Sequence, residues 1–204
     1  DAIIRIAKES PEAHPMGVVR TAISLLGHLD PDCEVNSAEA ELRKSMRLLA
    51  TIPVCIGIHQ RALGGKPPVA PDPSLDHAAN LLWCMTGEKP GEIAAKVMDV
   101  SLILYAEHDF NASTFTSLVV ISTLSDLYSA CSAAVGALRG PLHGGANEMA
   151  MEMLKDIDRD CAGGKMTVDA WMQRAFAEKR KPNFKGWKNP DDRYRLPTVD
   201  SVKG

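Results

Sequence analysis

The sequence has few aromatic residues, no Cys-x-x-Cys pair and no long apolar segment. Phe, Trp and Tyr make up 5% of its 204 residues, although apolar residues reach 45%. A core must therefore be built from Leu, Ile, Val, Met and Ala, and the chain is long enough for one sizeable core. No apolar run approaches the roughly 18 residues that a membrane-spanning helix needs, so no span is predicted.

An excess of one charge is also absent. The chain carries 23 Lys and Arg against 26 Asp and Glu, a net charge of −3, which gives no reason to expect binding to nucleic acid or an anionic membrane. The five cysteines are odd in number and widely spaced: Cys33, Cys55, Cys84, Cys131 and Cys161. They are typical of buried thiols in a reducing compartment, so we expect the cytoplasm or the mitochondrial matrix.

Strand-like alternation and internal repeats are missing, whereas helical periodicity runs through most of the chain. The predicted fold class is therefore all-α. Helices are expected over 10–29, 38–63, 75–85, 92–106, a segment ending near 124, 127–138 and 168–180. Their starts are indicated by Ser10 before Pro11, by Ser37, by Ser125 with Asp126, and by Thr167. Pro53 should kink or split the longest helix, and 64–73, with two glycines and four prolines, should form a loop.

The segment with the strongest functional signal is Gly-Pro-Leu-His-Gly-Gly-Ala-Asn at 140–147. Its glycines remove side-chain bulk and allow positive φ, so a ligand would be able to approach the His143 imidazole and the backbone N–H groups. A helix starting behind it would point its positive end at the same spot, which disfavours imidazolium and leaves a neutral donor to polarise a carbonyl. The alternative is a glycine-rich turn whose histidine only caps or packs.

A second polar cluster lies upstream. Glu107 and Asp109 flank His108, and Asn111 and Ser113 follow where a new helix would be capped. Such a cluster would bind a metal, bind a polyanion through His108, or simply form a well-capped turn. No His-x-x-x-His or His-x-His pair accompanies it, so no metal site is predicted.

Together these segments resemble the citrate synthase family, most closely its bacterial-type and 2-methylcitrate synthase branch. The matching segments occur in family order: 13–16 with Arg20 and Thr21, 102–108, 111–115 and 136–148. The resemblance runs from about residue 12 to about residue 177. It implies the family's helical large domain over 1–163, followed over 164–204 by the start of the small domain. The charged composition of the tail offers an alternative for 164–204, a divergent C-terminal arm that wraps around a partner with Trp187 and Tyr194 as anchors.

Enzymes of this family condense acetyl-CoA or propionyl-CoA with oxaloacetate and then hydrolyse the thioester, without a tightly bound cofactor. The resemblance implies that His143 is catalytic and hydrogen-bonds the thioester oxygen while the enol forms, because a fixed donor stabilises charge that develops there. It implies that His108 contacts the oxaloacetate carboxylate. The other implied substrate-binding residues are Asn111, Ser113, Gly144, Gly145 and Asn147.

Family members are dimers, so the resemblance also implies a homodimer. The helix expected at 127–138 is rich in small residues and is our candidate for burial between subunits. His108 and His143 should face one cleft.

The chain departs from the family at its C-terminal end. No histidine follows His143, and the family's second catalytic histidine, catalytic aspartate and later arginines have no counterpart here. If the native polypeptide ends at Gly204, the resemblance implies no turnover. The alternative function is that of a catalytically degenerate homologue acting as a structural or assembly subunit of a larger complex. The intact set of polar residues around His108 and His143 favours the enzyme, since a scaffold has no physical need for it.

Overall fold

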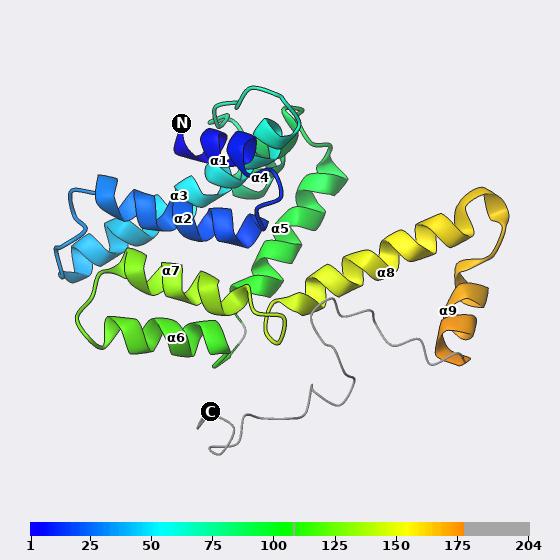
Figure 1. Cartoon of the computed structure of the whole chain (residues 1–204). Helices are drawn as coiled ribbons and strands as arrows, with labels where there is room; N and C mark the ends of the chain where they lie inside the picture. Colours follow the sequence, from blue (N-terminus) through cyan, green and yellow to red (C-terminus); the bar gives the residue numbers. More distant parts are fainter. Residues whose placement is uncertain (108, 178–204) are drawn as a thin grey trace, which may run out of the picture. The chain divides into compact units, whose positions relative to one another are not determined.

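The structure, a computed structural model, describes residues 1–107 and 109–177 (Figure 1). Over these residues it contains helices and no strand, so the all-α prediction is confirmed. The elements are α1 (Ala2–Glu9), α2 (Pro15–Leu29), α3 (Ala38–Leu63), α4 (His77–Thr86), α5 (Glu92–Ala106), α6 (Ala112–Ile121), α7 (Leu127–Leu138), α8 (Gly145–Cys161), the short 3-10 helix η1 (Ala162–Gly164) and α9 (Val168–Ala177).

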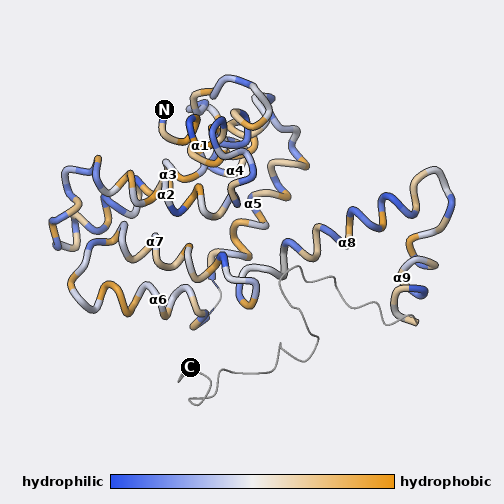
Figure 2. The backbone as a smooth tube through the Cα atoms, viewed as in Figure 1, coloured by the Kyte–Doolittle hydropathy of each residue, from blue (hydrophilic) through white to orange (hydrophobic). Residues whose placement is uncertain are grey.

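The chain forms two compact units, Asp1–Arg139 and Gly140–Gly204. In the first unit α7 packs against α2 and α6, while α3 packs against α1, α2 and α4, and α5 packs against α4 (Figure 1). In the second unit α8 packs against α9. Among the helices, α6 is strongly apolar and α8 mainly hydrophilic (Figure 2). The family-domain boundary expected after residue 163 stays a prediction.

The start of α2 differs from the prediction. Ser10 does not cap α2 but ends α1, a helix that the sequence analysis did not predict, because Pro11 supplies no N–H to continue α1. The helix α2 begins at Pro15, and the Nδ1 atom of His14 accepts the backbone N–H of Met16 at 3.2 Å. Ser10-Pro11 and His14-Pro15 each offer a cap residue followed by a proline at the first helical position. Serine is the commoner cap, so the sequence favoured Ser10 although α2 starts after His14.

The other boundaries follow the prediction more closely. The hydroxyl of Ser37 accepts the N–H of Ala40 at 3.3 Å and opens α3 as expected. Pro53 lies inside α3 without splitting it, since packing against four other helices, α1, α2, α4 and α7, holds the segment helical on both sides. The loop over 64–73 is confirmed. The helix α6 ends at Ile121, three residues before the expected 124, and the predicted end of α9 at Arg180 lies outside the described residues.

The first unit is held together by a small apolar core and a buried polar network. Ile23, Leu48 and Tyr128 join α2, α3 and α7. The Asp30 side chain, only 3% exposed, accepts hydrogen bonds from the Tyr128 hydroxyl and from Arg47 Nη1, the latter at 2.6 Å. Burial acts to raise the pKa of Asp30, but the bonds from Tyr128, from the Asp32 backbone and from Arg47 together hold that pKa below its ordinary value. The network therefore ties the end of α2 to the following helix α3 and to α7, which is distant in sequence.

Replacing Tyr128 by phenylalanine removes one donor from a buried carboxylate. We expect Tyr128→Phe to lose about 1.5–3 kcal/mol of unfolding free energy at pH 7, the usual contribution of a hydrogen bond to a charged group. Because the folded-state pKa of Asp30 is lowered, its ionised form stabilises the fold above its ordinary pKa, and this contribution disappears as the pH falls through the folded value. Urea unfolding at pH 7 and near pH 3 should show the two proteins converging in acid. An equal difference at both pH values would contradict this account of Asp30.

Candidate active site

The residues predicted for the site fall into two segments, one in each compact unit. The first unit carries the turn between α5 and α6, with Asn111 and Ser113. The second unit carries His143, Gly144, Gly145 and Asn147 at the start of α8. His108 lies outside the described residues. The expected cleft shared by His108 and His143 therefore stays a prediction, and each segment is described by itself.

The α5–α6 turn brings Asn111 and Ser113 together. Asn111 is the N-cap of α6, and its Oδ1 accepts the N–H of Thr114 at 2.8 Å and the hydroxyl of Ser113 at 2.6 Å. These bonds satisfy the first turn of the helix in the way expected from the sequence. Because they use the carbonyl oxygen of the amide, its nitrogen is the atom through which Asn111 would donate to a substrate oxygen.

The backbone of the same turn has an uncommon conformation. Asp109 has a φ of 52°, in the left-handed region that few residues other than glycine adopt. Its N–H donates to the Glu107 carboxylate, Oε1, at 2.7 Å. Phe110 follows and meets Phe115 edge to face, with ring centroids 5.9 Å apart. Sequence analysis missed this bond between Glu107 and Asp109, since no spacing rule marks such a contact.

The loop before α8 places His143 next to a helix N-terminus. The N–H groups of His143 and Gly144 both donate to the carbonyl of Gly140 at 2.9 Å, and α8 begins at Gly145. Gly144, the N-cap, has a φ of −93°, so it does not use the positive φ that glycine allows. The N-cap residue Gly144 has no side chain and makes no capping hydrogen bond to the first turn of α8. Asn147 lies in the first turn of α8, where the structure describes its backbone but not its side chain.

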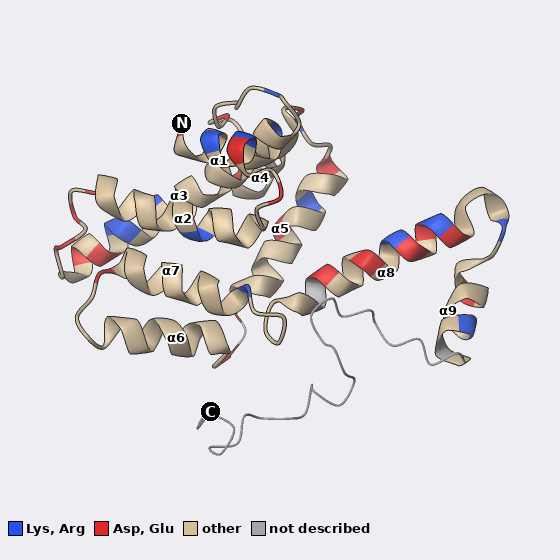
Figure 3. Cartoon of the chain, viewed as in Figure 1, with Lys and Arg blue, Asp and Glu red and all other residues tan. Residues whose placement is uncertain are grey.

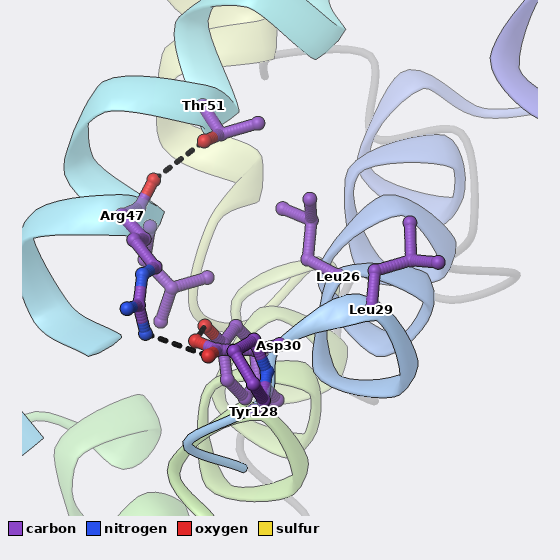
Figure 4. A pocket seen from close by; sticks show the side chains of 8 residues that line it. Leu26, Leu29, Asp30, Arg47, Thr51 and Tyr128 are labelled. Atoms are coloured by element: carbon purple, nitrogen blue, oxygen red, sulfur yellow. Dashed lines mark hydrogen bonds and ion pairs between the residues drawn. The ribbon is translucent and has the colours of Figure 1, made fainter. Parts of the chain in front are cut away.

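The structure also contains a cavity that was not predicted. It measures about 190 Å³ and lies between Leu26 and Leu29 of α2 and Arg47 and Thr51 of α3, beside the buried Asp30 (Figure 4). None of the predicted site residues that the structure describes lines it. Sequence patterns did not indicate it because its polar wall joins residues up to 98 positions apart.

The part of the chain that the structure describes contains neither a metal site nor a membrane-spanning helix. Within 1–107 and 109–177, no group of three or more His, Cys, Asp and Glu side chains is arranged to hold a metal ion. In the same residues no helix combines the length and the apolarity needed to cross a membrane.

Similarity to known proteins covers more of the chain than the short segments around His108 and His143. The citrate synthase C-terminal domain pattern matches residues 1–195. The 2-methylcitrate synthase of Mycobacterium tuberculosis (strain H37Rv) is 45% identical over 176 residues, which cover 86% of this chain and 43% of that protein. The citrate synthase of Mycolicibacterium smegmatis is 42% identical over 197 residues, covering 95% of this chain and 51% of that protein.

The fold agrees with these matches. The solved ternary complex of carboxymethyl coenzyme A and oxaloacetate with the citrate synthase of Thermoplasma acidophilum superposes with a TM-score of 0.62 at 28% identity, over 82% of this chain and 47% of that one. The chain spans about half the length of the curated relatives it matches. A domain match over almost the entire sequence, supported by more than 40% identity to these enzymes, shows that this chain belongs to the citrate synthase family.

Proposed function

We propose that this chain supplies part of the active site of an enzyme that condenses acetyl-CoA or propionyl-CoA with oxaloacetate, as a citrate or 2-methylcitrate synthase does. The observation that carries the proposal is the intact segment 140–147 in a family member, with His143 directly before the uncapped N-terminus of α8. A histidine that can donate a hydrogen bond and the positive end of a helix are adjacent in the chain there, which suits an oxygen that gains negative charge.

His143 is the catalytic residue of this proposal. It donates a hydrogen bond to the thioester oxygen while the α-proton of the acyl group leaves and the enol forms. Gly144 and Gly145 leave room for the thioester near the first N–H groups of α8, and Asn147 belongs to the same turn. The base that removes the proton is not assigned to any residue of this chain. The enol carbon then bonds to the carbonyl carbon of oxaloacetate. The C=O π bond of oxaloacetate opens and its oxygen takes up a proton to become a hydroxyl, while the enol loses its O–H proton and the thioester carbonyl re-forms. Water then cleaves the new thioester to a carboxylate and free CoA.

The α5–α6 turn supplies the oxaloacetate side of the proposed site. His108 binds a carboxylate of oxaloacetate, and Asn111 contributes its side-chain nitrogen as a donor. Ser113 orients that amide by donating its hydroxyl to Asn111 Oδ1. The reaction transfers no electrons and therefore requires no redox cofactor, and in this proposal His143 and the N-terminus of α8 stabilise the enol without a metal. Acetyl-CoA and propionyl-CoA differ by one methylene, a difference that pockets discriminate by only about 1–3 kcal/mol. Acetyl-CoA and propionyl-CoA are therefore both proposed as substrates.

We further propose that the protein is a homodimer, with the interface on α6 rather than on the predicted α7. The helix α7 is already covered by α2 on one side and α6 on the other. In contrast, α7 is the sole partner of α6 among the described helices, and α6 has no buried residue. Neither helix carries a Lys, Arg, Asp or Glu (Figure 3). Phe115, Leu118 and Val119 form one apolar face of α6 and are 56%, 47% and 51% exposed. A second copy would cover this face.

An acidic residue on the α6 face should separate the subunits. Leu118→Asp would place a carboxylate in an apolar interface, where it loses its hydration without gaining a partner. We expect sedimentation velocity to show a dimer for the wild type and a monomer for this variant. Ile93→Asp, an equally drastic change at an exposed position of α5, should leave the dimer intact and serves as the control. A Leu118→Asp variant that stays dimeric would place the interface elsewhere.

The proposal also includes a reducing compartment, the cytoplasm or the mitochondrial matrix, because all five cysteines are free in the structure. The structural or assembly subunit considered as the alternative is not proposed. The relatives compared above bear the names of enzymes, and none of them is described as a structural subunit.

Thiol release tests the proposal in solution. The full-length polypeptide that contains this chain, with its ends established by intact mass, is mixed with oxaloacetate and either acyl-CoA, and free CoA is detected with a thiol reagent. We expect release that requires both substrates together. Release from acyl-CoA without oxaloacetate would indicate a simple thioesterase, and no release with either acyl-CoA would refute the proposed reaction.

A further inference from the structure

The turn between α5 and α6 is fixed by two bonds from side chains to the backbone. Glu107 ends α5 in an extended conformation, and its carboxylate accepts the N–H of Asp109 at 2.7 Å. Asn111 opens α6, and its Oδ1 accepts the N–H of Thr114 at 2.8 Å. Asp109, between the two helices, has a φ of 52°. Asp109 therefore has a backbone conformation that few residues other than glycine adopt, and the Glu107 bond helps to hold it.

A negatively charged side chain is unexpected at position 107, next to the proposed binding site of a dicarboxylate. The proposed function places a dicarboxylate against His108 and Asn111, the immediate sequence neighbours of this bond, and like charges repel at short range. A carboxylate there is unfavourable for substrate binding unless it is engaged elsewhere. The bond from the Asp109 N–H occupies Oε1 of this side chain, so Glu107 is engaged by the backbone of its own turn.

We infer that Glu107 is a positioning residue for oxaloacetate. It makes no contact with substrate, and it acts by holding the Asp109 N–H, which keeps the backbone of the turn in the conformation that presents the oxaloacetate-binding donors. This inference rests on the proposed function for the identity of the ligand. In this inference Glu107 acts through the oxygen that accepts the hydrogen bond and not through its negative charge.

Two substitutions separate these properties. Glu107→Ala removes the acceptor, whereas Glu107→Gln keeps an oxygen acceptor in the same place and removes the charge. In the full-length protein we expect Glu107→Ala to weaken oxaloacetate binding about tenfold or more, since misplacement of positioning groups by an ångström costs factors of this size. The KM for acyl-CoA should stay within about twofold, because the second segment of the site is untouched. Glu107→Gln should bind oxaloacetate as tightly as the wild type or slightly better.

Calorimetric titration with oxaloacetate and steady-state kinetics with both substrates decide the inference. Glu92→Ala, which removes an exposed carboxylate at the other end of α5, is the matched control and should change nothing. Thermal melting checks that each variant is folded. Oxaloacetate affinity of Glu107→Ala within twofold of the wild type would overturn the inference, as would Glu107→Gln being as weak as Glu107→Ala. If the wild type binds oxaloacetate but forms no product, the proposed reaction fails while the calorimetric comparison still decides the role of Glu107.

Discussion

Removing the imidazole of His143 should lower kcat of the full-length protein by at least ~100-fold, the usual effect of losing one donor that stabilises developing charge. His143 precedes the uncapped start of α8, so His143→Ala would leave the thioester oxygen with the helix N-terminus alone. The loss should appear in kcat more than in KM, because the bond strengthens as the oxygen gains charge. Stopped-flow or steady-state thiol release with saturating substrates measures it.

His28 provides the control for this substitution. It is an exposed histidine in the last turn of α2, so His28→Ala removes the same side chain from a site outside the proposed chemistry. We expect its kcat to match that of the wild type. A loss below about tenfold in a well-folded His143→Ala protein would remove His143 from the reaction.

The second large effect concerns stability at the α3–α4 contact. A Cβ atom at Gly57 would lie 2.6 Å from both Cβ and the backbone oxygen of Cys84, closer than real Cβ atoms come to other atoms. Gly57→Ala should therefore force the two helices apart and cost about 3 kcal/mol, at the upper end for overpacked cores. The backbone of Cys84 cannot turn aside as a flexible side chain can, so the cost should outweigh alanine's better helix propensity of roughly 1 kcal/mol.

Gly17 supplies the opposite case within the same fold. It lies in α2, and no heavy atom is within 4 Å of a Cβ built there. Gly17→Ala should be neutral or stabilising by roughly 0.5–1 kcal/mol, because alanine loses less backbone entropy than glycine. Chemical denaturation of both variants measures the contrast. Equal stability of the two would show that α3 and α4 do not approach as closely as described.

Local signals predicted most helix boundaries, whereas contacts between helices were not predictable. The hydroxyl of Thr167 accepts the N–H of Ala170 at 3.2 Å, and the Asp126 carboxylate accepts that of Ser129 at 2.8 Å, both as expected from cap residues. Such bonds involve residues three positions apart and leave a pattern in the sequence. The bond between Tyr128 and Asp30 spans 98 positions and depends on how α2 and α7 pack, which no short pattern encodes.

The candidate site divides in the same way. The capping role of Asn111 was predictable from its position before an apolar helical segment. The roles of His108 and His143 came from resemblance to a family, since a glycine-rich turn alone is equally compatible with a structural histidine. The positive φ of Asp109 and its bond to Glu107 were not predictable, because aspartate adopts this conformation only where neighbouring contacts favour it.

Formation of a new carbon–carbon bond tests the central claim most directly. The full-length protein is incubated with oxaloacetate and with acetyl-CoA or propionyl-CoA labelled with ¹³C at the carbon next to the thioester carbonyl, and the products are followed by NMR. The proposed function predicts that this carbon becomes bonded to the former carbonyl carbon of oxaloacetate, giving citrate or 2-methylcitrate at the rate of CoA release. Labelled acetate or propionate as the only product, with oxaloacetate unchanged, would contradict it.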